Sequence, residues 1–146
     1  MRNAIILLIA SLLLYTCGCS EDTCNVCPRE LTDVEREDIV RANCVKLSMA
    51  ADEFSRQNDG IYAWNIDTDT TLTGKTIMDL MPDDGYLLNP FTGRYTEPAA
   101  DEDMARRPGE VGYRPYAHVD PVAYLITACG SQPDSFIVVI VSSPMW

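Results

Sequence analysis

Residues Thr32 to Gly60 carry the pattern that most restricts how this chain can fold. Apolar side chains recur there every three or four residues, which is the spacing of one face of an α-helix. The residues on this face are Val40, Cys44, Leu47, Ala51 and Phe54. Charged residues occupy the positions between them, so the pattern predicts a long amphipathic helix. The rest of the domain must supply the surface that covers its apolar face.

Both ends of the predicted helix carry boundary signals. Thr32 and Glu35 fit the S/T-x-x-E capping box, in which the hydroxyl and the carboxylate each accept a hydrogen bond from a backbone N–H that the helix leaves free. Asn58, Asp59 and Gly60 tolerate a left-handed backbone, which predicts that the helix stops there.

Three β-rich runs make up the last third of the chain: Val111 to Val119, Val122 to Cys129, and Phe136 to Ser142. Short turn sequences separate them, which predicts an antiparallel meander. The third run, FIVVIVS, is apolar at both alternating sets of positions, so we expect this strand to be the most buried and to be covered by the helix. The fold class is therefore α+β: one long N-terminal helix packed on a C-terminal antiparallel sheet of three to four strands.

A long segment rich in Gly, Pro, Asp, Asn and Thr connects the helix to these strands and predicts an irregular loop. Within it, Thr76 to Met81 predicts one or two helical turns that end at Pro82, and Glu97 to Arg107 is expected to be the loosest part. Its aspartates offer the oxygen ligands that Ca²⁺ prefers, but their spacing matches no calcium-binding loop, and we interpret them as surface acids. They are Asp67, Asp69, Asp83, Asp84, Asp101 and Asp103.

The charge balance excludes one class of partner. The chain has 146 residues and a formal net charge of −11 at pH 7. The length fits a single domain. Nucleic-acid binding requires a basic surface that this composition does not provide, so we expect no nucleic-acid partner.

The first eighteen residues predict a lipoprotein signal peptide. A charged start and an apolar run of about a dozen residues are followed by Thr16-Cys17-Gly18-Cys19. This sequence resembles a bacterial lipobox, in which a small residue precedes the cysteine that receives the lipid. Cys19 is the better acceptor because Gly18 precedes it, and Cys17 is the alternative. We expect a protein of the cell envelope, held on a membrane by its lipid and facing the periplasm or the exterior; an ordinary secretory leader is the other interpretation.

Residues 19–31 are polar and predict a tether between the lipid and the globular domain, residues 32–146. The tether contains Cys24 and Cys27 in a C-x-x-C spacing, which is also the spacing of thiol-disulfide exchange proteins. Nothing before the motif predicts the strand that accompanies such chemistry, so a local disulfide or two free thiols are the simpler interpretation. A metal site would need further ligands, so we expect no metal site.

The two remaining cysteines predict a disulfide between helix and sheet. Cys44 lies on the apolar face of the predicted helix, and Cys129 ends the second predicted strand. Outside the cytosol an even number of cysteines favours disulfides. Cys44 and Cys129 are therefore predicted to be bonded, and the alternative is a pair of buried free thiols.

Catalytic constellations are not visible in the sequence. His118 is the single histidine and falls in a β-rich run, and Ser142 and Ser143 have no histidine near them in sequence. No phosphate-binding or dinucleotide-binding glycine motif is present. We expect no enzyme activity and no cofactor.

Four short motifs, taken in their order, resemble those of type IV pilins and of the G-type pseudopilins of type II secretion. Residues 54–62, FSRQNDGIY, resemble the end of the pilin spine helix, and residues 89–93 match an N-P-F-T-G element. Residues 108–113, PGEVGY, resemble a P-G-x-I-G-Y strand start, and residues 124–130, YLITACG, resemble the Y-x-I-x-x-x-G strand that follows it. The family's G-F-x-x-x-E processing site and its long apolar helix are not found here, and a lipid on Cys19 stands in their place.

The resemblance implies a pilin-like structural or protein-interaction module of the envelope, associated with a type II secretion or type IV pilus system, with envelope proteins as partners. Two alternatives belong to other classes. One is a membrane-tethered thiol-disulfide protein that uses Cys24 and Cys27, and the other is a lipoprotein that binds a small ligand or a surface.

Overall fold

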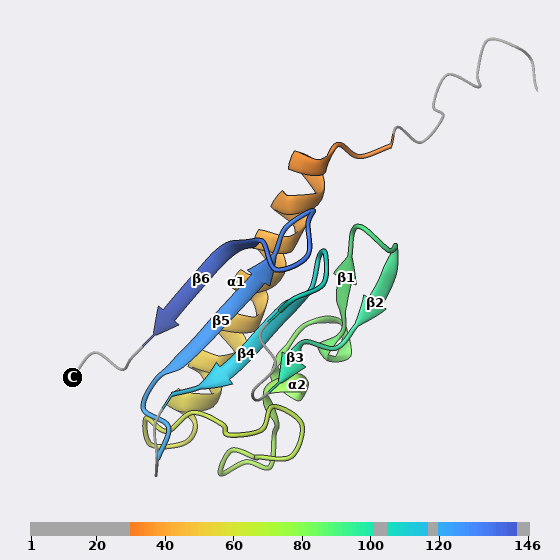
Figure 1. Ribbon diagram of the computed structural model, residues 1–146. Helices are drawn as coiled ribbons and strands as arrows, with labels where there is room; N and C mark the ends of the chain where they lie inside the picture. The colour runs from red at the N-terminus through yellow and green to blue at the C-terminus, as the bar shows by residue number, and fades with distance from the viewer. Residues whose placement is uncertain (1–29, 101–104, 117–119, 143–146) are drawn as a thin grey trace, which may run out of the picture. The chain divides into compact units, whose positions relative to one another are not determined.

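The structure is a computed structural model, and it describes residues 30–100, 105–116 and 120–142. The compact unit begins at Leu31. In this unit a single long helix lies against one face of a sheet, and a small hairpin stands beside the sheet (Figure 1). Among the described residues, no helix is both long and apolar enough to cross a membrane.

Helix α1, Asp33–Arg56, forms for the reasons that the sequence gives. The Thr32 hydroxyl accepts a hydrogen bond from the Glu35 N–H, and the Glu35 carboxylate accepts one from the Thr32 N–H at 2.8 Å, so the predicted capping box is confirmed. All five residues of the predicted apolar face are fully buried or nearly so. Asp59 and Gly60 then take positive φ angles of 53° and 85°, and the chain leaves the helix as expected.

The main sheet has four strands in the order β3-β4-β5-β6. These are β3, Ala99–Ala100; β4, Val111–Pro115; β5, Tyr124–Cys129; and β6, Phe136–Ser142. Strands β4, β5 and β6 form the predicted antiparallel meander, and α1 packs across all three. The α+β class is thus confirmed.

One part of the sheet prediction is wrong, because the sheet is mixed rather than antiparallel. Strand β3 pairs with β4 in parallel, with Ala99 opposite Gly112 and Ala100 opposite Tyr113. It comes from the segment Glu97 to Arg107, which we expected to be loop. Two alanines in a charged segment carry no periodic signal, so local pattern gives no means of finding this strand.

The connecting segment contains more regular structure than its composition predicts. The predicted helical turn is present as α2, Ile77–Leu80, with Thr76 and Asp79 forming its own capping box. A 3-10 turn, η1, follows at Asp83–Gly85. Strands β1, Leu87–Asn89, and β2, Arg94–Thr96, then form an antiparallel hairpin.

The order of burial among the strands reverses our expectation. The most buried strand is β5, in which Tyr124, Ile126 and Ala128 are fully covered by α1 and the neighbouring strands. Strand β6 lies at the edge of the sheet and remains half exposed. The prediction that the Phe136 strand is the most buried is therefore wrong, since an apolar sequence does not distinguish a central strand from an edge strand.

Candidate interaction surface

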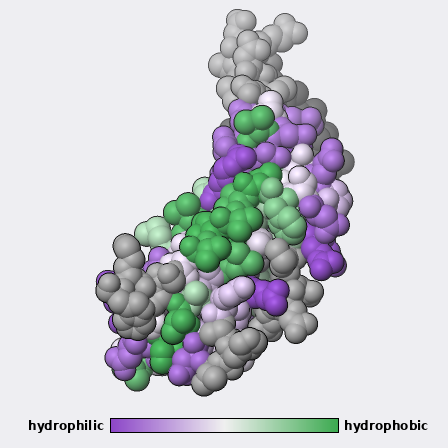
Figure 2. Space-filling view, turned by 60° about the vertical axis from the view of Figure 1, so that its left-hand side comes forward, coloured by the Kyte–Doolittle hydropathy of each residue, from purple (hydrophilic) through white to green (hydrophobic). Residues whose placement is uncertain are grey.

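Strand β6 exposes apolar side chains at the edge of the sheet. Phe136 is 43% exposed, Val139 60% and Val141 70%. The strand has seven residues and carries no charge. Among the described residues no strand pairs with its outer edge. Figure 2 shows a hydrophobic patch at the centre of this side of the molecule, with hydrophilic residues around it.

The two faces of β6 differ in what covers them. Ile140 stands opposite Ile126 of β5, and both belong to the core beneath the helix. Val139 stands opposite Thr127 on the other face. There, the Thr127 hydroxyl accepts a hydrogen bond from the Ala105 N–H at 3.1 Å, so the chain before β4 covers the middle of this face. The covering stops short of β6, which leaves Val139 and Val141 exposed.

Carboxylates lie near both ends of β6. Asp134 precedes the strand in the turn from β5, and in the same turn the Ser131 N–H donates to a Glu37 oxygen at 3.3 Å. At the other end, Ser142 stands opposite Tyr124, whose hydroxyl is 3.0 Å from an Asp52 oxygen. The uncharged strand therefore runs between two acidic positions.

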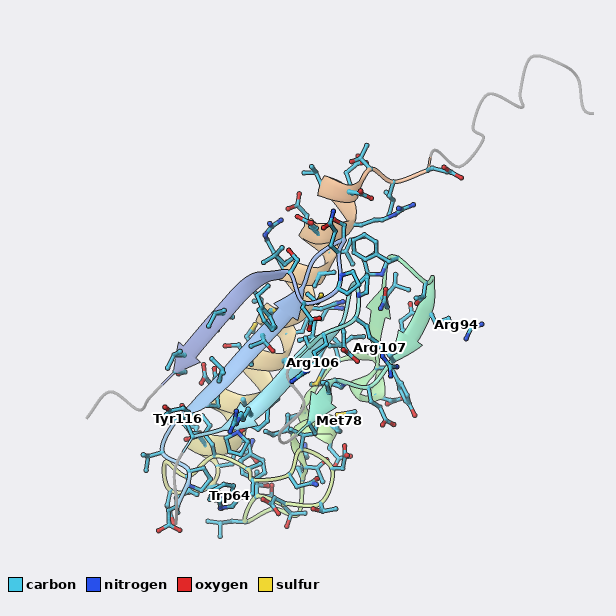
Figure 3. All side chains as sticks on the ribbon, viewed as in Figure 1. Trp64, Met78, Arg94, Arg106, Arg107 and Tyr116 are labelled. Carbon is cyan, nitrogen blue, oxygen red and sulfur yellow. The ribbon has the colours of Figure 1, made fainter. Side chains whose placement is uncertain are left out.

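The basic side chains fall into two groups. The four on α1 each form an ion pair with a carboxylate of the described chain; they are Arg36, Arg41, Lys46 and Arg56. Five others, from the segments after α1, have no ion pair among the described residues: Lys75, Arg94, Arg106, Arg107 and Arg114. Arg94 and Arg107 lie on the hairpin side of the molecule, away from β6 (Figure 3).

Asn89 joins two of the motifs that the sequence analysis singled out. Its side-chain oxygen accepts hydrogen bonds from the Phe91 N–H at 3.0 Å and the Thr92 N–H at 3.2 Å, which holds the N-P-F-T-G turn. Its side-chain amide donates to the Pro108 carbonyl at 2.8 Å, which holds the start of the P-G-E-V-G-Y segment. One buried side chain thus fixes the hairpin to the chain that leads into β4.

Gly109 makes this junction possible. It has a φ of +76°, and a Cβ atom there would overlap the Asn89 side-chain oxygen and carbon. A residue with a side chain would therefore face both backbone strain and a steric clash. The sequence offered the motifs separately, but no local signal shows that they meet.

A cleft of about 590 Å³ opens beside the junction. Phe91 lines it together with Arg94 from β2 and Arg107 from the segment before β4. Glu110 also lines it, but one of its oxygens accepts hydrogen bonds from the Arg106 and Arg107 N–H groups at 2.9 and 3.0 Å. The cleft is therefore lined by two arginines that have no ion pair in the described chain and by one carboxylate that is already engaged.

The predicted Cys44–Cys129 disulfide is not present, and both residues are buried free thiols. The prediction assumed that both side chains point into one interface. Residues 124, 126 and 128 of β5 belong to the core beneath α1, so residue 129 has the parity of the opposite face. Its thiol donates instead to the Gln132 carbonyl at 3.1 Å.

The two cysteines also lie at different heights along the axis of α1. The residue after Cys129, Gly130, lies against Glu37, whose Oε1 would be 2.9 Å from a Cβ atom placed on this glycine. Seven residues separate Glu37 from Cys44, which is about 10 Å along the helix axis. A disulfide requires Cα atoms within about 7 Å of each other.

Burial makes the Cys44 thiol unreactive. Burial raises its pKa to about 12, so the nucleophilic thiolate is scarce at neutral pH. The pKa of Cys129 is also raised, chiefly by burial. Neither residue has the lowered pKa of a redox-active cysteine.

The sequence analysis missed a partly buried polar network between α1 and β5. The Tyr124 hydroxyl contacts the Ser48 hydroxyl at 2.8 Å and an Asp52 oxygen at 3.0 Å, and the Tyr62 hydroxyl donates to the same oxygen at 3.3 Å. Burial raises the pKa of Tyr124 to about 12. Ser48 and Asp52 follow each other at the i, i+4 spacing on α1, but only the three-dimensional structure shows which tyrosine they meet.

Of the described aspartates that were considered as calcium ligands, Asp69 holds a turn, and Asp67, Asp83 and Asp84 lie at the surface. Asp69 accepts hydrogen bonds from the Trp64 and Asn65 N–H groups at 2.7 and 3.1 Å, and Asp83 pairs with Lys46. Asp67 and Asp84 are exposed. In the ranges that the structure describes, no group of three or more His, Cys, Asp or Glu residues could hold a metal ion.

Several predicted positions lie outside the described residues. They are the lipidation candidates Cys17 and Cys19, the C-x-x-C pair Cys24 and Cys27, His118, Asp101, Asp103 and Ser143. The predicted lipid anchor and the predicted chemistry of the C-x-x-C pair therefore stay predictions.

No known protein family, no curated protein and no solved structure matches this chain in sequence or structure comparisons.

Proposed function

We propose that this protein is a lipid-anchored, extracytoplasmic, pilin-like module that binds another protein of the cell envelope and has no catalytic role. The lipid sits on Cys19, residues 19–31 form the tether, and the α+β domain presents the binding surface. The partner belongs to a type II secretion or type IV pilus apparatus.

The observation that carries this proposal is the exposure of β6. Three large apolar side chains of one uncharged strand, Phe136, Val139 and Val141, are exposed to solvent. Contiguous exposed apolar patches mark protein interaction sites. Such a patch binds a partner because binding removes apolar surface from water, and this requires no catalytic residue.

The pilin-like assignment is supported by the order and contacts of the motifs. The long helix, the N-P-F-T-G turn, the P-G-E-V-G-Y segment and the meander follow one another as the resemblance implies, and Asn89 bonds the second of these to the third. The parallel strand β3 is an addition that the resemblance did not lead us to expect.

The anchor is tested by metabolic labelling with a palmitate analogue. We expect the protein to be labelled and the Cys19→Ala variant to lose the label, because the lipid is attached through that thiol. A label that survives in Cys19→Ala and disappears in Cys17→Ala would move the anchor to the other cysteine. Absence of label from the wild-type protein would contradict lipid anchoring.

The binding surface is tested in cells with a photo-crosslinking residue at position 141 and, as matched control, at position 72. Val141 is 70% exposed and Leu72 77% exposed, so both report on equally accessible sites. We expect a discrete adduct with an envelope protein from position 141 alone. Equal adducts from both positions, or none from position 141, would contradict the proposed surface.

A second candidate function, binding of a small anionic ligand, is favoured by the cleft of about 590 Å³ with Arg94 and Arg107 on its walls. Arginine side chains bind carboxylates and phosphates through paired N–H groups. Isothermal titration calorimetry with citrate and with pyrophosphate tests this candidate. Binding that is lost in Arg107→Gln would support it, and no heat from either anion would remove it.

A further inference from the structure

We propose that β6 accepts a fifth strand from its partner, and that this strand is an apolar segment with basic residues on both sides. This inference deepens the proposed function and rests on it, since it names how β6 binds and what kind of segment it binds. Binding to the exposed side chains alone would satisfy the proposed function without satisfying this inference.

The backbone of β6 offers hydrogen-bonding groups to an added strand. The Cys129 N–H donates to the Glu110 carbonyl at 2.9 Å, so residue 129 directs its backbone groups toward β4. Neighbouring residues of a strand direct theirs to opposite sides, which turns Ala128 and Ile126 toward β6. Their partners Val138 and Ile140 are then engaged with β5. By the same alternation, the N–H and C=O groups of Val139 and Val141 point to the open edge.

From Val138 to Ser142, β6 has none of the features that protect an edge. Edge strands in soluble proteins are protected by charged residues, by proline, by a bulge or by being short. Strand β6 has seven residues with no charge and no proline. Its one bulge, at Ile137, lies next to the start of the strand and leaves the rest of the edge regular. The opposite edge of the sheet is β3, which has two residues. The contrast indicates that β6 is paired when the protein functions.

The same two residues present both parts of a recognition site. Val139 and Val141 point their side chains to the exposed face and their backbone groups to the open edge. An added strand would therefore gain backbone hydrogen bonds from these residues and pack its own apolar side chains beside theirs. This is the recognition mode of strand addition, in which the backbone supplies affinity and alternate side chains supply specificity.

Charge selects the kind of strand. Asp134 precedes β6, and Asp52 lies near its other end through Tyr124. The chain as a whole carries a formal charge of −11. A second copy would bring the same acids to the same positions, and like charges disfavour such pairing. A segment with basic residues on both sides of an apolar core places positive charge against these acids.

Synthetic peptides test the inference on the unaltered protein. The first has a core of alternating valine and threonine, seven residues long, with two lysines on each side, and the second has glutamates in place of the lysines. The third is the lysine peptide with N-methyl groups throughout its core, which keeps the side chains but removes the backbone donors. Fluorescence anisotropy measures their affinity for the domain.

We expect the lysine peptide to bind, and both others to bind at least about tenfold more weakly, because each has lost charge complementarity or two or more hydrogen bonds. Equal binding of the lysine peptide and its N-methylated form would overturn strand addition while leaving binding to the β6 side chains, and thus the proposed function, intact. Equal binding of lysine and glutamate peptides would overturn the charge selection. No binding by any peptide would overturn the inference as a whole.

A pair of variants at one position separates the backbone from the side chain. Val139→Pro removes the N–H that faces the open edge, where proline is tolerated because that group has no partner within the sheet. Val139→Thr keeps the N–H and reduces the apolar surface. We expect Val139→Pro to lose the peptide and Val139→Thr to bind it more weakly than the wild-type protein but more tightly than Val139→Pro, with folding of both checked by circular dichroism. The reverse ranking would contradict strand addition.

Sedimentation of the domain, with and without peptide, tests whether a second copy of this chain occupies the open edge of β6. We expect a monomer in both samples at low salt. A dimer that the Val139→Pro variant abolishes would assign the open edge to a second copy and overturn the basic segment.

Discussion

Strands β5 and β6 are neighbours of similar composition in very different surroundings. Ile126 of β5 and Ile140 of β6 stand opposite each other in the sheet. Ile126 is fully buried, whereas β6 has three strongly exposed apolar side chains. Apolar sequence is needed in β5 because neighbours cover both its faces. In β6 the apolar sequence exceeds what the described fold buries, and this excess is the basis of the proposed binding surface.

The first prediction compares the two isoleucines directly. Ile126→Ala should lower the free energy of unfolding by about 4 kcal/mol, because it removes buried area and leaves a cavity under α1. Ile140→Ala should cost about 2 kcal/mol, since that side chain is only partly buried. Urea unfolding measures both. Equal costs would show that the two strands are equally buried in solution.

The second prediction uses alkaline pH to probe the interface between α1 and β5. Burial raises the pKa of Cys44 from 9.0 to about 12 and that of Tyr124 from 10.0 to about 12. Above pH 9 the unfolded chain loses these protons before the folded one does, so the stability present below pH 9 falls as pH rises. Each pH unit costs up to about 1.4 kcal/mol per group.

Chemical denaturation between pH 8 and 11 measures this loss. In Cys44→Ala the fall between pH 9 and 10 should be shallower than in the wild-type protein, because Cys129, whose pKa is also raised by burial, is then the one remaining thiol of the domain that contributes there. An unchanged slope in this variant would show that the Cys44 thiol is not buried in the folded protein.

The third prediction concerns β6, the more exposed of the two strands. Val139→Thr should change the free energy of unfolding by no more than about 0.5 kcal/mol, since a side chain that is 60% exposed contributes little to the core. Urea unfolding in parallel with Ile126→Ala provides the measurement. A cost near that of Ile126→Ala would mean that β6 is covered within the protein's own fold.

The last prediction expects no effect. A reducing agent should leave the melting temperature of the domain unchanged, because Cys44 of α1 and Cys129 of β5 are free thiols. The isolated residues 31–146 serve for this measurement, so that Cys24 and Cys27 are absent. Peptide mapping without reduction should recover both thiols in alkylatable form after unfolding. Recovery of the two peptides as a linked pair would show that the Cys44–Cys129 disulfide forms.

The parts of the fold that the sequence predicted are those that local chemistry determines. The apolar spacing and the capping box of α1, the turn residues after it and the three strands of the meander each follow from neighbours in sequence. The parallel pairing of Ala99 and Ala100 and the bonds of Asn89 to Pro108 depend on residues far apart in the chain. No periodicity contains that information.

The candidate interaction surface could not be predicted from the sequence for a related reason. The apolar run of β6 was recognised, but its place at the edge of the described sheet depends on which strands pair with one another, and the run itself carries no such information. The cysteine prediction was wrong because successive residues of a strand point to opposite faces, so a single step along β5 decides which face residue 129 occupies. Strand boundaries known to within one residue would be needed to predict it.

The hydrogen bond between Asp52 and Tyr124 spans 72 residues, and this span bears on the order of folding. Helix α1 is made early, but its apolar face is covered by strands that end at Ser142. At a synthesis rate of 5 to 20 residues per second, the helix waits about 4 to 20 s for them. A helix without its packing surface is only marginally stable in water. The chain therefore stays unfolded until nearly all of it has emerged.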